Sequence, residues 1–143
     1  MLVSQVLRAK GDLVFTASPR DSVDAVAAML NTRRIGAIVV VDGDREVVGI
    51  VSERDIVRIV AEEGASALAR PVAQCMTRDV IFAQPAEPID AILARMTDRR
   101  IRHLPVCADG RLIGIVSIGD LVKAKIAETE AEAEELRAYI AAA

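Results

Sequence analysis

Residues Gly49 to Asp55 read GIVSERD, and residues Gly114 to Asp120 read GIVSIGD. Each stretch ends an apolar strand with a serine and an aspartate three residues apart. The flanking sequence repeats as well, because VFTASP from Val14 matches VIFAQP from Val80 and RRI from Arg33 matches RRI from Arg99. The chain of 143 residues is therefore written twice, with one residue lost in a turn of the second copy.

Each copy predicts the order strand, helix, strand, strand, helix. Apolar residues recur at three and four positions after Ser22 and after Pro88, which indicates a helix with one buried face. Asp-Gly turns join the later strands into hairpins. The expected strands are 14–16, 37–41 and 46–52 in the first copy and 80–82, 103–107 and 111–117 in the second, with further helices starting at Ser52 and Ser117.

A mixed α/β (α+β) fold follows, with two β-α-β-β-α repeats. A half of roughly 60 residues buries too little surface to be comfortable alone. We therefore expect the repeats to pack about a pseudo-twofold axis. The predicted domains are 1–64 for the first repeat with its N-terminal segment, 65–127 for the second repeat, and 128–143 for a C-terminal helical extension.

Composition excludes several classes of function. The net charge is −3 and only 2% of residues are aromatic, which disfavours nucleic-acid binding. One histidine and two cysteines cannot form a credible metal centre, and no catalytic triad or phosphate-binding glycine loop is present, so an enzyme is not expected. Without an apolar run of membrane length or a secretory start, the protein is expected to be cytoplasmic.

The Ser-x-x-Asp spacing has two explanations. It is the spacing of a capping box, in which serine and carboxylate satisfy the first amides of a helix. It also places a carboxylate beside a helix N-terminus, where vicinal hydroxyls and a phosphate could bind. Gly49 and Gly114, inside the strands, suggest close approach of another backbone or of a ligand and favour the second explanation.

Over residues 5 to 127 the chain resembles a tandem pair of cystathionine β-synthase (CBS) domains, a Bateman module. The resemblance is carried by VVGIVSERDIV, LIGIVSIGDLV, RRIRHLPV and the repeat itself. It implies a regulatory module, similar to stand-alone bacterial members, that binds AMP, ADP or ATP in clefts between the repeats. S-adenosylmethionine and NAD are further ligands of such modules, and no cofactor is required.

The resemblance also implies site residues. Asp55 and Asp120 match the aspartate that binds ribose, and Ser52 and Ser117 match the hydroxyl residue near ribose and phosphate. Arg54 would reach a phosphate in the first site, where the second has Gly119, so we expect unequal sites. The remaining matches line the base or hold the adenine edge: Thr16, Ala37, Ile38, Ala83, His103, Leu104 and Pro105. Val39 replaces this proline in the first repeat, and His103 could equally be a core histidine.

Beyond the second repeat, a helix without Pro or Gly continues to the end of the sequence. Val122, Ile126, Thr129, Ala133, Leu136 and Ile140 follow alternating steps of four and three, which is a heptad seam. The seam predicts packing on the body or on a second copy in a homodimer. The leading hypothesis is thus a nucleotide sensor acting on an unknown regulated protein, and the alternative is a structural or protein-interaction homodimer with empty clefts.

Overall fold

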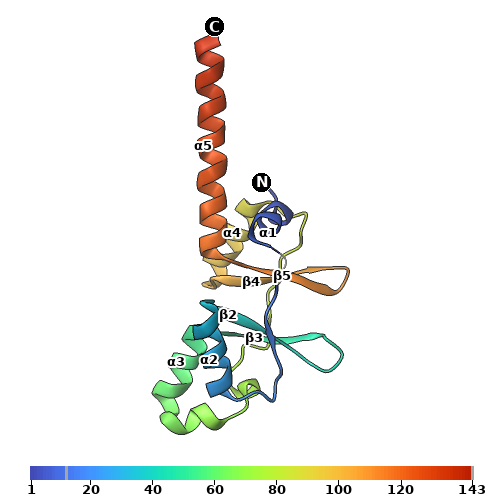
Figure 1. The fold of residues 1–143 in the computed structure, drawn as a ribbon, viewed down its shortest axis with the longest axis vertical. Coiled ribbons are helices and arrows are strands. Elements are labelled where there is room, and N and C mark those ends of the chain that lie inside the picture. Colours follow the sequence, from blue (N-terminus) through green and yellow to red (C-terminus); the bar gives the residue numbers. More distant parts are fainter. Residues whose placement is uncertain (12, 143) are drawn as a thin grey trace. The chain divides into compact units, whose positions relative to one another are not determined.

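The computed structural model describes residues 1–11 and 13–142, which fall into two compact units (Figure 1). Unit 1 comprises Met1–Asp12, Phe82–Ala108 and Ile113–Ala143, and unit 2 comprises Leu13–Ile81 and Asp109–Leu112. Residues 12 and 143, which the sequence placed in the first and third domains, lie outside the described residues.

Unit 2 contains the first repeat and a three-stranded sheet. Strand β2 (Ala37–Val41) lies between β1 (Thr16–Ala17), which is parallel to it, and β3 (Val47–Ser52), which is antiparallel. The unit's other elements are helices α2 (Val23–Arg33) and α3 (Glu53–Glu63) and the short 3₁₀ turns η1 (Ala65–Ala69) and η2 (Val72–Gln74).

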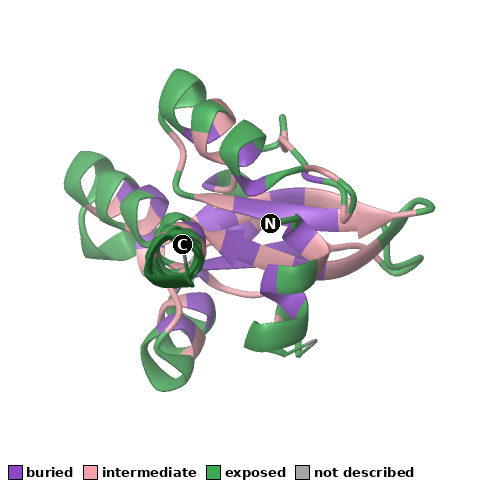
Figure 2. Ribbon diagram, turned by 90° about the horizontal axis from the view of Figure 1, so that it is seen from above, coloured by how far each residue is buried: buried purple, intermediate pink, exposed green. Residues whose placement is uncertain are grey.

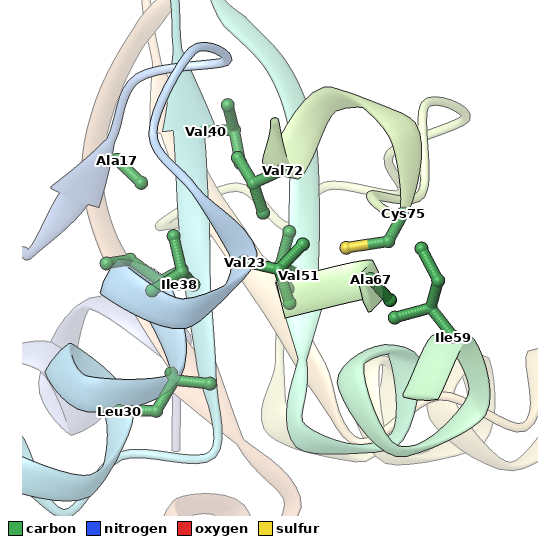
Figure 3. Packing of buried hydrophobic residues seen from close by; sticks show 11 residues of the cluster. Ala17, Val23, Leu30, Ile38, Val40, Val51, Ile59, Ala67, Val72 and Cys75 are labelled. Carbon is green, nitrogen blue, oxygen red and sulfur yellow. The ribbon is translucent and has the colours of Figure 1, made fainter. Parts of the chain in front are cut away.

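The core of unit 2 is aliphatic. Figure 3 shows side chains from β1, α2, β2, β3, α3 and the two 3₁₀ turns converging on one cluster. Val23, Val26 and Leu30 supply the α2 face that the three-and-four spacing predicted. Because β2 carries four consecutive buried residues, its unbroken apolar sequence is explained by burial on both faces.

Unit 1 contains the second repeat. Helix α4 (Ile89–Arg99) precedes the hairpin of β4 (His103–Ala108) and β5 (Arg111–Ser117), and α5 (Ile118–Ala142) follows it. The turn of this hairpin and the first two residues of β5 are the exception, because Asp109–Leu112 is grouped with unit 2. The hairpins and helix starts in both repeats agree with the sequence expectation. None of the helices in the described part of the chain is long and apolar enough to cross a membrane.

The strand expected at residues 80–82 is wrong. Phe82 is exposed and only Ala83 pairs, in a single parallel bridge to Val106. Ala83 donates its amide to the Pro105 carbonyl (2.9 Å) and accepts from the Cys107 amide (3.0 Å). Since Pro85 follows two residues later and cannot donate to a ladder, pairing ends almost where it begins.

Unit 1 contains both the N-terminal segment and the C-terminal segment of the chain, which differs from the grouping by sequence order. Helix α1 (Val3–Lys10) was not anticipated from the sequence, and it packs with the second repeat rather than with the first. The Val3 amide donates to the Glu87 carbonyl (2.9 Å) and the Ile89 amide to the Met1 carbonyl (3.0 Å). Residues 65–81, expected to start the second domain, belong to unit 2, where the Val72 amide donates to the Asp21 carbonyl (2.7 Å).

Candidate functional site: two Ser-x-x-Asp corners

In the first corner, Ser52 ends β3 and caps α3. Its Oγ accepts from the Asp55 amide (3.3 Å), and Asp55 Oδ2 accepts from the Ser52 amide (2.9 Å) and hydroxyl (3.1 Å). The capping box anticipated from the spacing is therefore complete. The other oxygen, Oδ1, accepts from Arg58 Nη2 at 2.7 Å, and Asp55 is only 7% exposed.

The second corner repeats the box with a different cation. Asp120 Oδ2 accepts from the Ser117 amide (2.9 Å), and Ser117 Oγ accepts from the Asp120 amide (3.1 Å). The same Oδ2 accepts from Lys10 Nζ of α1 (2.7 Å), which also donates to the Ile115 carbonyl (2.8 Å). Burial would raise the pKa of the Asp120 carboxyl, but the hydrogen bonds from Lys10 and Ser117 and the charge of Lys10 hold that pKa below its ordinary value.

The carboxylates of Asp55 and Asp120 differ in how many hydrogen-bond acceptor positions remain unused. A carboxylate offers about four acceptor positions, two on each oxygen. Asp55 uses both oxygens, whereas Asp120 Oδ1 has no hydrogen-bond donor among residues 1–11 and 13–142. The Asp120 side chain is also more accessible, at 26% against 9% for Asp55. The second corner therefore presents an oxygen that can receive two hydroxyl donors.

Each predicted set of site residues gathers within one unit. In unit 2, Ala37 lies opposite Ser52 and Ile38 opposite Val51, while Thr16 pairs with Val39. In unit 1, the Ile118 amide donates to the Arg102 carbonyl (2.8 Å), which brings the Ser117 corner beside the start of β4. That start carries the remaining predicted residues of the second set, namely His103, Leu104 and Pro105, and Ala83 is bonded to Pro105.

The strand segments expected to hold adenine lie just ahead of the pairing with the first strand. The β1 ladder begins at Val39, one residue after Ile38. In unit 1 the corresponding bridge begins at the Pro105 carbonyl, one residue after Leu104. Ala37, Ile38, Leu104 and Pro105 are buried, His103 is half-buried, and Thr16 and Arg54 are exposed.

Both strand glycines lie against other parts of the chain. A Cβ on Gly49 would come within 2.5 Å of Met76 Sδ and 3.0 Å of the Thr77 carbonyl oxygen. A Cβ on Gly114 would come within 2.6 Å of Leu7 Cδ2. The close approach that these glycines predicted is made by the protein's own side chains and backbone, so the glycines do not distinguish a binding corner from a cap.

Two cations at these corners were missed. Arg58 was detectable, because a cation three residues after an aspartate on a helix is a recognised pairing. Lys10 had no local signal, since it lies 110 residues from Asp120 in sequence. Lys123 occupies the repeat position of Arg58, yet Lys10 takes its place at the carboxylate.

The two cysteines and the acidic residues add no redox or metal centre to the described part of the chain. Cys75 and Cys107 are free thiols. Burial raises the pKa of both, and the Asp55 charge raises that of Cys75 further. No group of three His, Cys, Asp or Glu residues among the described positions could hold a metal ion.

Comparisons of the sequence and of the structure with known proteins point to the same family. The CBS domain model matches residues 11–62 and 72–127. The structure is similar to a CBS-domain containing protein, ATU1752, from Agrobacterium tumefaciens (TM-score 0.85, 44% identity, covering 87% of this chain and 92% of that one).

Two further similar structures contain ligands. One is the CBS domain pair of protein MJ0100, in complex with 5′-methylthioadenosine and S-adenosyl-L-methionine (TM-score 0.80, 28% identity, 90% of this chain and 98% of that one). The other is CBS domain protein PAE2072 from Pyrobaculum aerophilum, complexed with AMP (TM-score 0.75, 28% identity, 84% of this chain and 89% of that one).

Proposed function

The chain belongs to the CBS domain family, and we propose that it is a non-catalytic regulatory protein that binds an adenosine-containing nucleotide at its Ser-x-x-Asp corners. AMP, ADP or ATP is the proposed ligand class, and the two adenosine ligands in a similar structure keep S-adenosylmethionine in the test set. The observation that carries the proposal is the Asp120 carboxylate at the start of α5, which is fixed through Oδ2 and has no donor on Oδ1 among the described residues.

The geometry of the second corner suits a ribose. Two vicinal hydroxyls can donate to one carboxylate, and Oδ1 of Asp120 has both acceptor positions available within the described residues. Because Lys10 and Ser117 hold Oδ2, the carboxylate is oriented before the ligand arrives, which lowers the entropic cost of binding. At the first corner, Arg58 already occupies Oδ1 of Asp55 and would have to share or leave it.

We therefore propose unequal sites, with the Asp120 corner binding ribose more tightly. Arg54 at the first corner, exposed in the first turn of α3, is the proposed phosphate contact there. A nucleotide regulates only through different affinities for two states of the protein, so regulation would need a partner or conformation that distinguishes the bound form.

A second function has an observation in its favour. Both corners are complete helix caps without any ligand, since serine and aspartate satisfy each other at α3 and at α5. A protein-interaction scaffold with empty corners would need the same residues. The two functions differ in what the aspartates do beyond capping.

Isothermal titration calorimetry with AMP, ATP, NAD and S-adenosylmethionine separates them. We expect micromolar binding that Asp120→Asn weakens by about tenfold or more and Asp55→Asn weakens less. Ser22→Ala is the matched control, because it removes the cap of α2 and has no proposed ligand role. If no ligand binds, or if all three variants lose only thermal stability, the scaffold function is the correct one.

A further inference from the structure

Arg58 holds the carboxylate of the first corner from the exposed face of α3. Its Nη2 donates to Asp55 Oδ1 at 2.7 Å, and its side chain is 54% exposed while that of Asp55 is 9% exposed. The other carboxylate oxygen, Oδ2, already accepts from the amide and the hydroxyl of Ser52. Two ribose hydroxyls can therefore use both acceptor positions of Oδ1 only if the guanidinium leaves it.

A second arginine lies beside Arg58 on the same helix. Arg54 is four residues earlier, and residues four apart on a helix are neighbours on one face. Both arginines are exposed, and Figure 2 shows that exposed residues, in green, make up much of the helices while buried residues, in purple, gather in the strands. Arg54 makes no ion pair within residues 1–11 and 13–142. The start of α3 thus carries two cations, of which only Arg58 is bound to a carboxylate.

A phosphate on the ligand would supply the anion that Arg58 loses when it leaves Asp55. A guanidinium donates in parallel to two phosphate oxygens, and the N-terminus of a helix favours the same negative charge. Arg58 would then exchange one oxyanion for another, and Oδ1 would become available to the ribose hydroxyls. A nucleoside brings the hydroxyls without the anion, so freeing Oδ1 for it breaks an ion pair that no other contact replaces.

The second corner lacks this arrangement. Gly119 and Lys123 take the repeat positions of the two arginines, and Lys123 makes no ion pair among the described residues. The cation that does bind Asp120 is Lys10, which donates to Oδ2 and not to Oδ1. Ribose hydroxyls can therefore bind Oδ1 of this corner without displacing a cation.

We propose that Arg58 determines which ligands the first corner accepts. This corner binds adenosine ligands that carry a phosphate and rejects those without one, whereas the second corner binds both classes. The assignment rests on the proposed function, since it requires that Asp55 and Asp120 bind ribose. It gives the two corners of one chain different ligand classes, although their serine and aspartate are the same.

Calorimetric titration of the wild-type chain with AMP and with adenosine tests this difference without any substitution. We expect AMP to fill both corners of each chain and adenosine to fill only the second over the same concentration range. If neither ligand binds, the proposed function is wrong and the assignment to Arg58 is wrong with it. If both ligands bind with the same stoichiometry, the proposed function stands and the role of Arg58 is overturned.

The variant Arg58→Met tests the residue itself, in an Asp120→Asn background that leaves the first corner intact. We expect Arg58→Met to weaken AMP binding by about tenfold and to strengthen adenosine binding by about tenfold, because methionine neither binds phosphate nor occupies Oδ1. A purely structural role of Arg58 would shift both affinities in the same direction, and that result would overturn the proposal. Lys123→Met is the matched control at the equivalent repeat position, and it should change neither affinity.

Discussion

At the scale of single residues, the two aspartates occupy the same position in the repeat and have different surroundings. Ser52, Asp55, Ser117 and Asp120 were predictable, because repetition and helix-capping spacing both point to them. Lys10 was not, because only folding brings it to Asp120. The consequence is that the second corner depends on α1, whereas the first depends on its own helix through Arg58.

Replacing Lys10 should therefore lower the stability of unit 1 and leave the Asp120 carboxylate less firmly oriented. We expect Lys10→Met to lower the free energy of unfolding by about 1 kcal/mol, since it removes one charge-assisted hydrogen bond and a half-exposed ion pair. Lys123→Met is the matched control. Lys123 is an exposed lysine on α5 that occupies the repeat position of Arg58, and Lys10 takes its place at the Asp120 carboxylate. Chemical denaturation of both variants measures the difference, and equal stability of the two would contradict the role of Lys10.

The same contact gives a pH dependence of known sign. The folded-state pKa of Asp120 lies below its ordinary value, so this contribution is fully present above the ordinary aspartate pKa and is lost as the pH falls through the folded pKa. The loss belongs to the acid range below about pH 4. Denaturation midpoints of wild type between neutral and acid pH should fall more steeply than those of Lys10→Met, and parallel curves would contradict this.

At the scale of elements, the spacing of apolar residues predicted the helices and strands that have a buried face. Helices α2 and α4 and both hairpins were found where apolar spacing and turn residues placed them. The segment 80–82 was read as a strand because it is apolar, but apolar residues near a proline can extend without pairing. Helix α1 was missed although Val3, Val6 and Leu7 have helical spacing, since eight residues give a weak signal.

The strand glycines make an element-scale prediction. Gly49→Ala should lower the free energy of unfolding by about 1–3 kcal/mol, because the new methyl group meets the Thr77 backbone as well as Met76. Gly114→Ala should cost less, since Leu7 presents only the far end of a flexible side chain. Thermal melting of the two variants ranks them, and a larger loss for Gly114→Ala would contradict the assignment of these contacts.

At the scale of the whole molecule, the repeat predicted the family and the number of corners but not how the chain divides. Boundaries drawn in sequence order assume that each repeat folds from one contiguous stretch. In the structure, residues 1–11 complete the unit of the second repeat and residues 65–81 complete that of the first. No local sequence pattern marks this division of the chain, because it is made by backbone hydrogen bonds between distant segments. One example is the bond from the Val3 amide to the Glu87 carbonyl.

The central claim is that a corner carboxylate recognises a ribose, and the most direct measurement needs no substitution in the protein. The wild-type chain is titrated calorimetrically with AMP and with 2′,3′-dideoxy-AMP. The analogue lacks only the two ribose hydroxyl donors, while the base, the phosphate and the helix caps of the protein are the same in both titrations. We expect micromolar binding of AMP and binding of the dideoxy analogue that is weaker by about a hundredfold, because the oriented carboxylate loses both partners. Equal affinity for the two nucleotides would contradict ribose recognition by Asp55 and Asp120.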